Sequence, residues 1–252
     1  LRRLDGSSVY EVAGSRMFTS PAILAAEGSL IAAAARLDGR AVTSADVEIA
    51  LLESVANGLT LNPAQAQMVR DLACSGRRLQ LAIAPAGSGK TTAMRVLAAA
   101  WTATGGTVIG LAPTAVAAAG LRGEINTTSD TLAALTHGLT TGTLPEWAAT
   151  VDESTLVVVD EAGMAGTLDL AAGVAWLLER GASVRLVGDD QQLASISAGG
   201  VLRDLAATVG ASTLSELVRF SDPAEAAATL ALRAGDAMAL GFYVDNDRVH
   251  VG

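Results

Sequence analysis

The chain has 252 residues, of which 50% are hydrophobic and 17% charged, so it has enough apolar side chains for a sizeable core and is not disordered by composition. No apolar stretch reaches the roughly 18 to 20 residues that cross a bilayer, and we expect no membrane insertion. The single cysteine, Cys74, excludes an internal disulfide, and the distant His137 and His250 form no metal-site pattern. We therefore expect a reducing, cytoplasmic setting. Because the chain starts at Leu1 without a signal segment, we expect a fragment or a processed form.

The charge pattern singles out one residue. A net charge of -9 argues against wrapping of duplex DNA by a broad basic face, although it leaves room for a narrow groove that binds a single strand. Lys90 is the only lysine among 17 Lys+Arg residues. A position that keeps lysine where arginine is used everywhere else indicates a need for a compact point charge.

Residues 1–58 read as an N-terminal helical lead-in. Ser20-Pro21 is a helix-start signal, and Thr43 begins a second helix that stops at Gly58. Asn62-Pro63 then begins a third helix, which we expect to end near Ser75.

From residue 79 on, short apolar strands alternate with helices. We expect strands at 79–83, 107–111, 155–159, 183–187 and 213–217. We expect helices at 90–102, from 114, at 168–180, 200–207 and 222–235, with an irregular connection at 139–147. Near-continuous apolar strands between helices predict an α/β fold with a parallel sheet covered on both faces. In such a sheet the ligand binds at the carboxyl ends of the strands.

A glycine-rich turn at residues 84–91 follows the first expected strand. It matches the phosphate-loop pattern G-x-x-x-x-G-K-[ST] at Gly89, Lys90 and Thr91. Ala84 stands in place of the first glycine. Backbone amides and the helix start would hold phosphates, Lys90 would reach the β- and γ-phosphates, and the Thr91 hydroxyl would hold Mg²⁺. The expected nucleotide-binding residues are Ala86, Gly87, Ser88, Gly89, Lys90, Thr91 and Thr92. The alternative is an ordinary strand-to-helix turn.

Two further strands end in polar residues. The strand at 155–159 runs into Asp160, which would hold Mg²⁺, and Glu161, which could deprotonate the attacking water. The alternative is a strand-end cap beside a solvated glutamate. After the strand at 183–187, the uncharged amide of Gln192 could sense the terminal phosphate, or the segment is a polar turn.

Together these segments resemble superfamily 1 helicases of the RecD-like branch, whose first motor domain is a RecA-like P-loop NTPase domain. Residues 160–164 resemble its Walker B motif, residues 188–193 its motif III, and residues 214–219 its motif IV. The resemblance implies ATP and Mg²⁺ as ligands and an Arg219 that reaches the γ-phosphate. It also implies that Gln65, in a Q motif at 61–65, contacts adenine.

The resemblance further implies single-stranded DNA as a partner. Residues 112–115 are similar to motif Ia, which implies contacts from Thr114 and Ala115, and Thr131 stands at a second DNA-contacting position. The strings around 84–92, 188–196 and 219–235 are most similar to the helicase region of TraA-type conjugative relaxases, which implies other conjugation proteins as partners. The relaxase chemistry of that family is not expected here, because Tyr10 and Tyr243 come without a histidine cluster and read as packing residues.

We therefore expect a first RecA-like domain at 59–220 and, at 221–252, the start of a connection to a second motor domain that this chain lacks. The expected function is the motor domain of an ATP-dependent 5′-to-3′ DNA helicase that acts as a monomer. In isolation we expect weak or no unwinding and, at best, slow ATP hydrolysis. One alternative is a non-hydrolysing, nucleotide-controlled binding module. Another is a small-molecule kinase, which would leave Gln65 and Gln192 unexplained.

Overall fold

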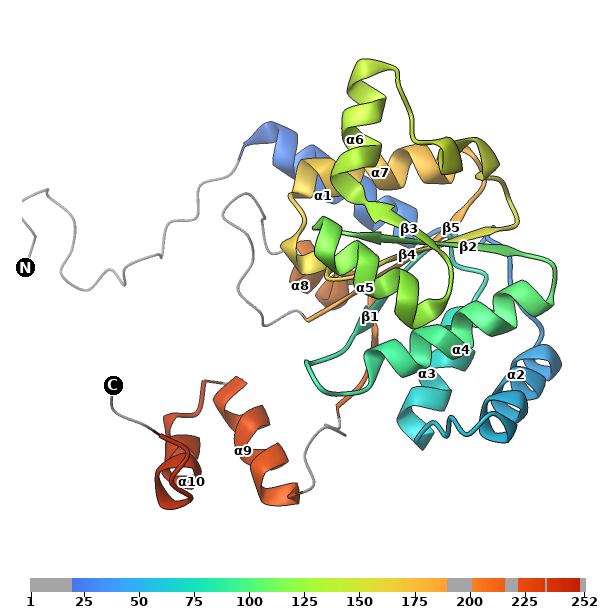
Figure 1. The fold of residues 1–252 in the computed structure, drawn as a ribbon. Coiled ribbons are helices and arrows are strands. Elements are labelled where there is room, and N and C mark those ends of the chain that lie inside the picture. Colours follow the sequence, from blue (N-terminus) through green and yellow to red (C-terminus); the bar gives the residue numbers. More distant parts are fainter. Residues whose placement is uncertain (1–19, 190–200, 216–221, 234, 250–252) are drawn as a thin grey trace, which may run out of the picture.

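The computed structural model describes residues 20–189, 201–215, 222–233 and 235–249 (Figure 1). A 6-stranded parallel sheet lies at the centre, in the order β3-β2-β4-β5-β1-β6. The strands are β1 (Leu79–Ile83), β2 (Thr107–Ala112), β3 (Thr128–Thr131), β4 (Thr155–Val159), β5 (Ser183–Gly188) and β6 (Ser212–Thr213). The expected α/β fold is confirmed.

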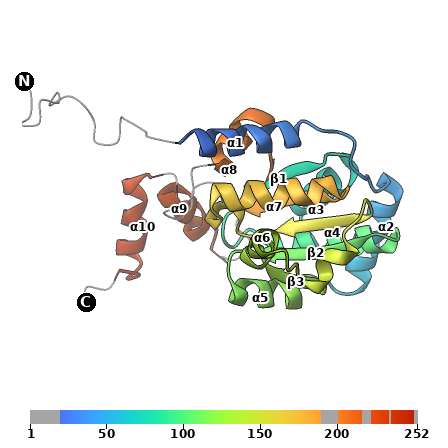
Figure 2. The ribbon, with the colours of Figure 1, turned by 90° about the horizontal axis from the view of Figure 1, so that it is seen from above.

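Helices cover both faces of the sheet (Figure 2). The helices are α1 (Pro21–Ala34), α2 (Ser44–Ala56), α3 (Pro63–Cys74), α4 (Lys90–Ala103), α5 (Ala115–Ile125), α6 (Leu132–Thr141), α7 (Thr167–Glu179), α8 (Val201–Val209), α9 (Pro223–Arg233) and α10 (Leu240–Asp245). Short 3-10 turns lie at Glu146–Thr150, Ala162–Met164 and Ala237–Ala239. Within the described ranges, no helix combines the length and the apolar character needed to cross a membrane.

The core consists of two layers, because side chains alternate along each strand. In β4, Val157 and Val159 face the layer that contains α1, α6, α7 and α8. Leu156 and Val158 face the opposite layer, which contains α2, α3, α4 and α5. Strands β1, β2, β4 and β5 are largely buried from both sides, as their near-continuous apolar sequences predicted.

The helical lead-in packs on both faces of this sheet. Helix α1 begins at the cap Ser20, whose hydroxyl accepts from Ile23 N at 3.2 Å, and Leu30 lies in the first core layer. Helix α2 begins at the cap Thr43, and Val47 lies in the second layer. The chain between α1 and α2 crosses the amino-terminal edge of the strands, where Gly39 N donates to Gly76 O at 2.8 Å. The described part of the lead-in therefore contributes side chains to both core layers, α1 to the first and α2 to the second.

The region between β2 and β4 differs from expectation. Strand β3 was not predicted, because its sequence, Thr128–Thr131, has no apolar periodicity and only Ser129 is buried. Helix α6 runs to Thr141, so the prediction of an irregular connection from residue 139 is wrong for its first three residues. Three threonines and a glycine give α6 low helix propensity, and burial of Leu132 and Leu135 stabilises it instead. The last strand is also shorter than predicted, since β6 ends at Thr213.

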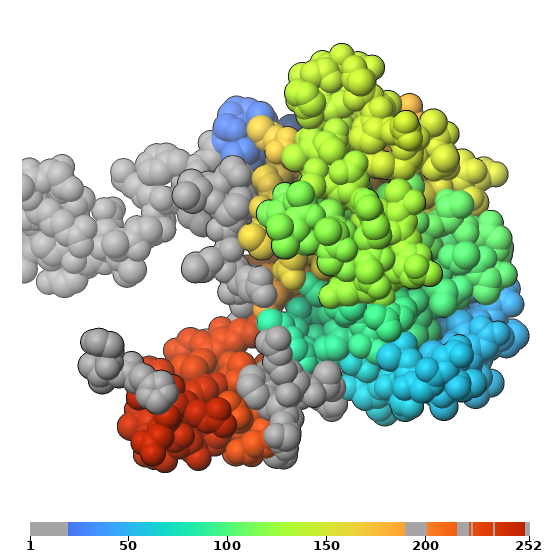
Figure 3. Space-filling model, in the orientation of Figure 1, coloured from blue at the N-terminus to red at the C-terminus, as the bar shows by residue number. Residues whose placement is uncertain are grey.

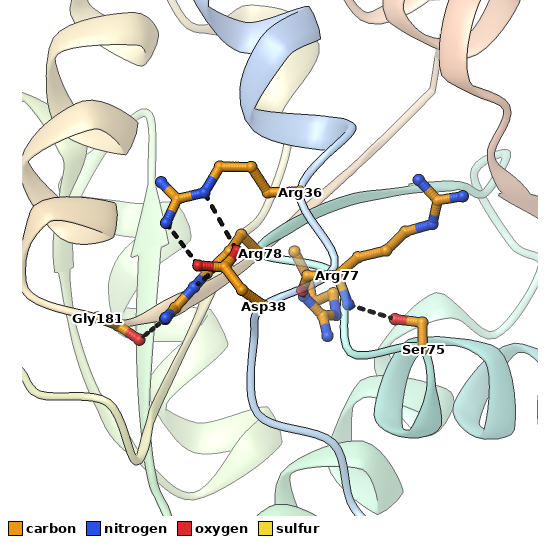
Figure 4. Close-up of polar contacts among 7 residues, drawn as sticks. Arg36, Asp38, Ser75, Arg77, Arg78 and Gly181 are labelled. Carbon is orange, nitrogen blue, oxygen red and sulfur yellow. Dashed lines mark hydrogen bonds and ion pairs between the residues drawn. The ribbon is translucent and has the colours of Figure 1, made fainter.

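Arginines at the amino-terminal edge of the sheet donate to carbonyls at the carboxyl ends of helices. Such carbonyls lack partners within their helix and carry the negative end of its dipole. The pairs are Arg77 Nη1 with Ala34 O of α1 (2.9 Å), Arg40 Nη2 with Thr104 O after α4 (2.6 Å), Arg185 Nε with Leu72 O of α3 (2.9 Å) and Arg78 Nη1 with Gly181 O after α7. Figure 4 shows Arg78 bonded to Gly181 and close to Asp38, which also pairs with Arg36.

Arg185 is a fully buried cation whose nearest described partners are carbonyls. Its Nη1 donates to Arg77 O and Val184 O, both at 3.0 Å, and its guanidinium lies 6.0 Å from the ring centre of Trp101. Burial lowers the pKa of Arg185 to about 9, because a charge is disfavoured away from water. The negative helix end at Leu72 O offsets part of that cost.

Candidate nucleotide site

The phosphate loop lies between β1 and α4, at the carboxyl edge of the sheet. Gly87 and Gly89 have φ angles of 83° and 78°, in the left-handed region that favours glycine. Gly89 is also the cap of α4 and gives it no side-chain hydrogen bond. The first-turn amides of α4 therefore point outward without a side-chain acceptor, as an anion site requires.

The buried Ser88 hydroxyl supports the same reading. Ser88 is 1% exposed, and its Oγ has no hydrogen-bond partner within the described residues. A buried polar atom without a partner is costly, and a ligand bound in the loop would complete the bonding of Ser88 Oγ. Ala84 fits in place of the first glycine of the pattern, because it does not have a positive φ and its N–H donates to Gly188 O at 2.9 Å.

Lys90 contacts both carboxylates that follow β4. Its Nζ lies 2.7 Å from Asp160 Oδ1 and 2.6 Å from Glu161 Oε1, and its side chain is 16% exposed. Burial by itself lowers the pKa of Lys90, but the two carboxylates outweigh burial and the pKa is raised. The three predicted residues therefore form one charged cluster, joined across 71 positions of sequence.

Glu161 has a strained backbone. Its φ of 49° is unusual for a residue with a side chain, and its N–H donates to Asp160 Oδ1 at 2.9 Å. Strain of this kind persists only where the surrounding structure imposes it, and it clusters at functional sites. The turn aims both carboxylates at Lys90.

Gln65 lies beside the loop and holds its backbone. Its amide nitrogen donates to Ser88 O at 3.0 Å, while its oxygen accepts from Asn62 N at 3.0 Å in the capping box of α3. The side chain is buried, with the residue 4% exposed. The contact of Gln65 with adenine stays a prediction. In this structure the Gln65 side chain bonds to the backbone groups Asn62 N and Ser88 O.

Thr114 and Thr131 cap neighbouring helices at the same edge. Thr114 Oγ1 accepts from Ala117 N at 3.1 Å at the start of α5, and Thr131 Oγ1 accepts from Ala134 N at 3.0 Å at the start of α6. Ala112 and Thr131 pair across β2 and β3, so the two helix starts lie side by side. Thr114 and Ala115 are exposed. The two positive helix ends suit a phosphate backbone, and the DNA contacts stay predictions.

Two predicted residues, Gln192 and Arg219, lie outside the described residues. The sequence patterns assigned no role to Asp189 or to Arg233, which the structure pairs. The carboxylate of Asp189, directly after β5, binds Arg233 at the end of α9. An isolated arginine in an alanine-rich helix gives no sequence signal for such a pair.

The residues at the loop fit Mg²⁺ with a nucleotide. Mg²⁺ takes one or two protein oxygens and completes its shell with water and phosphate oxygens. Thr91 and Asp160 offer a hydroxyl and a carboxylate of that kind at the ends of neighbouring segments. The described residues contain no group of three or more His, Cys, Asp or Glu that could hold a metal by itself. A metal that depends on nucleotide oxygens therefore suits this site better than a separate protein cage.

Relatives of known name support the family resemblance. The chain is 34% identical over 173 residues to a probable conjugal transfer protein TraA of Sinorhizobium fredii, and 34% identical over 173 residues to a TraA of Rhizobium radiobacter. These matches cover 69% and 68% of this chain but only 15% of each relative. The resemblance to TraA-type proteins is confirmed for this stretch alone.

A solved structure and a family model complete the comparison. The crystal structure of the Pif1 helicase from Candida albicans aligns with a TM-score of 0.50 and 17% identity, over 69% of this chain and 44% of that chain. An identity this low shows a shared fold only. A family model described as an AAA domain matches residues 60–252, which is more than half of the chain. The chain therefore belongs to this AAA domain family.

Proposed function

We propose that this chain is an ATP-binding and ATP-hydrolysing motor domain of a DNA helicase, with 5′-to-3′ polarity and a role in conjugative DNA transfer. The observation that carries the proposal is the cluster of Lys90, Asp160 and Glu161 next to the phosphate loop. A module that only binds nucleotide has no need for a second carboxylate beside the one that holds Mg²⁺. Unwinding and conjugation are proposed for the longer protein, since the matched stretch covers 15% of each relative.

In this proposal, Lys90 moves from the carboxylates to the phosphates of bound ATP, which frees Asp160 and Glu161. Bound Mg²⁺, held by Thr91 and Asp160, would supply neutralisation of phosphate charge. Glu161 would accept the proton of the attacking water. The buried Ser88 hydroxyl and the first-turn amides of α4 would complete the phosphate site.

Single-stranded DNA is the proposed partner at the threonine caps. The strand would lie across the starts of α5 and α6, with its phosphates near Thr114 and Thr131. The net charge of -9 repels a polyanion, so binding by this chain should be weak and strongly dependent on salt. We further expect a monomer and a cytoplasmic location.

The first experiment measures binding of a fluorescent ATP analogue with Mg²⁺, and ATP hydrolysis with and without single-stranded DNA. Hydrolysis that DNA stimulates is the expected result. Nucleotide binding with no hydrolysis under single-turnover conditions would favour a binding module, and phosphoryl transfer to a small metabolite would favour a kinase.

The second experiment tests the DNA path with charge changes that keep the helix caps. Thr114→Asp and Thr131→Asp retain a good cap residue but place a negative charge against the proposed phosphates. Thr141→Asp, at the other end of α6, is the matched control. Anisotropy at low salt should show weaker binding for the first two variants and little change for the control. Equal effects at all three positions would show that net charge, and not this path, governs binding.

A further inference from the structure

The end of β5 contacts both halves of the nucleotide site. Gly188 pairs with Ile83 of β1, and its carbonyl accepts from Ala84 N, where the phosphate loop begins. On its other side, a Cβ placed on Gly188 would lie 3.4 Å from Ala162 N and from Gly163 N, in the turn that follows Glu161. A displacement of this strand end would therefore reach the loop and the Glu161 turn together.

The next residue, Asp189, is fixed by a charge pair. Its side chain is only 5% exposed, and Arg233 Nε lies 3.1 Å and 3.2 Å from its two carboxylate oxygens. Arg233 Nη2 also donates to Oδ1. A carboxylate this deeply buried is stable as an ion only with a well-aligned partner, and the planar fork of arginine supplies one.

Arg233 comes from a different part of the molecule. It ends α9, which packs mainly with the turn 237–239 and α10, and Thr229 Oγ1 lies 2.6 Å from Tyr243 OH within this group. Figures 1 and 2 place α9 and α10 beyond the carboxyl ends of the strands, and in Figure 3 they form a lobe beside the main body. The pair with Asp189 joins this lobe to the sheet at the nucleotide site.

We propose that Arg233 is a positioning residue for ATP hydrolysis, which acts through Asp189 on the end of β5 and so on the turn that carries Glu161. This inference rests on the proposed function and names a residue outside the phosphate loop and the carboxylate cluster. Nucleotide affinity depends mainly on Lys90 and the loop amides, whereas the described partner of Arg233 is Asp189. Hydrolysis depends on the position of Glu161, where a misplacement of about 1 Å can lower the rate about 10²-fold.

The test compares Arg233→Met with Arg248→Met in the same lobe. The Arg248 side chain is 58% exposed and its Nη2 lies 3.5 Å from Glu225 Oε2, so it is a matched arginine whose described partner belongs to α9 and not to the sheet. We expect Arg233→Met to lower the single-turnover hydrolysis rate by roughly 10- to 100-fold, with the dissociation constant for MgATP changed by less than about threefold. Arg248→Met should change neither. Arg233→Lys, which keeps the charge without the fork, should fall in between.

A double-mutant cycle and amide exchange exclude a merely structural role. Asp189→Asn should slow hydrolysis as Arg233→Met does, and the double variant should be no slower than the slower single variant. With a non-hydrolysable ATP analogue and Mg²⁺, we expect amide protection of peptides covering 84–92 and 160–166 in the wild type. In Arg233→Met the protection of 84–92 should remain and that of 160–166 should be lost.

The outcomes separate this inference from the function on which it rests. A wild-type chain that fails to bind nucleotide would contradict the proposed function, and the inference with it. A wild type that binds, together with an Arg233→Met variant that matches Arg248→Met in rate and exchange, would overturn the inference alone. If Arg233→Met lowers the melting temperature but leaves the hydrolysis rate unchanged well below that temperature, Arg233 only stabilises the fold and the inference is wrong.

Discussion

Opposite ends of helices meet at the two edges of the sheet, and α4 contributes one end to each edge. At the carboxyl edge, the starts of α4, α5 and α6 converge with the positive ends of their dipoles. At the amino-terminal edge, the carboxyl ends of α1, α3, α4 and α7 converge, and arginines bind their carbonyls. Every parallel α/β sheet has this polarity, and here the side chains at each edge complement it.

The edges differ in the groups that their charged side chains contact. The carboxyl edge keeps a buried Ser88 hydroxyl without a described partner and a strained Glu161, and it holds the only lysine of the chain. At the amino-terminal edge, the arginines donate to backbone carbonyls of the fold itself, and Arg78 Nε and Arg185 Nη2 have no hydrogen-bond partner among the described residues. Changes at the carboxyl edge should therefore alter nucleotide chemistry, and changes at the amino-terminal edge should alter stability.

The largest effect is expected for Glu161→Gln. Loss of the proposed base should lower turnover by roughly 10²–10⁴-fold while nucleotide binding stays nearly intact. Single-turnover hydrolysis measures the rate, and Glu179→Gln, at the exposed end of α7, is a control with the same chemical change. Turnover within a few-fold of the wild type would place the base elsewhere.

Lys90→Ala should weaken MgATP binding by roughly 10- to 100-fold or abolish it, because charge-assisted hydrogen bonds contribute about 1.5–3 kcal/mol each. Lys90→Arg should not restore full affinity, since a planar guanidinium does not replace a compact ammonium. Titration with a fluorescent ATP analogue measures both variants. Unchanged affinity in Lys90→Ala would remove the phosphate-site assignment.

At the opposite edge, Arg185→Lys should lower the free energy of unfolding by about 2 kcal/mol. An ammonium cannot bond Leu72 O, Arg77 O and Val184 O together from this position, so buried carbonyls lose their donors. Urea unfolding measures the change. Nucleotide affinity of the folded variant should equal that of the wild type, and a loss of affinity would show that the two edges are coupled.

The smallest effect concerns Asp38. The hydrogen bond from Arg36 is the main reason that the pKa of Asp38 is lowered to about 2 from its ordinary value of 3.8. A depressed carboxyl pKa means that the pair stabilises the fold above pH 3.8 and that this contribution is lost as pH falls through about 2. An NMR titration of the Asp38 carboxyl carbon should show this midpoint, and Arg36→Met should move it back toward 3.8. High salt should weaken the shift, because both side chains are exposed.

Sequence patterns predicted the parts of the fold that depend on local signals. Strands β1 and β4 lie where their apolar runs predicted them, and Thr43 and Asn62 cap helices as their side-chain chemistry predicted. The phosphate loop was readable because left-handed glycines, a lysine and a hydroxyl must follow one another at fixed spacing. Strand β3 was missed because it is short and polar, and because tertiary contacts hold it: it pairs with β2, and Arg122 of α5 donates to Ser129 O.

What the sequence determined by itself is therefore the α/β class, the position of the phosphate loop and the identity of Lys90, Asp160 and Glu161 as candidates. Only the tertiary structure decided that Lys90 bridges both carboxylates, that Gln65 holds the loop backbone at Ser88, and that Arg233 fixes Asp189 across 44 positions. The physical reason is that local patterns reflect the conformation of neighbouring residues. The partner of a buried charge depends instead on the strand order and on which helix ends meet at one edge of the sheet. The hydrophobic periodicity of the sequence contains no information on either.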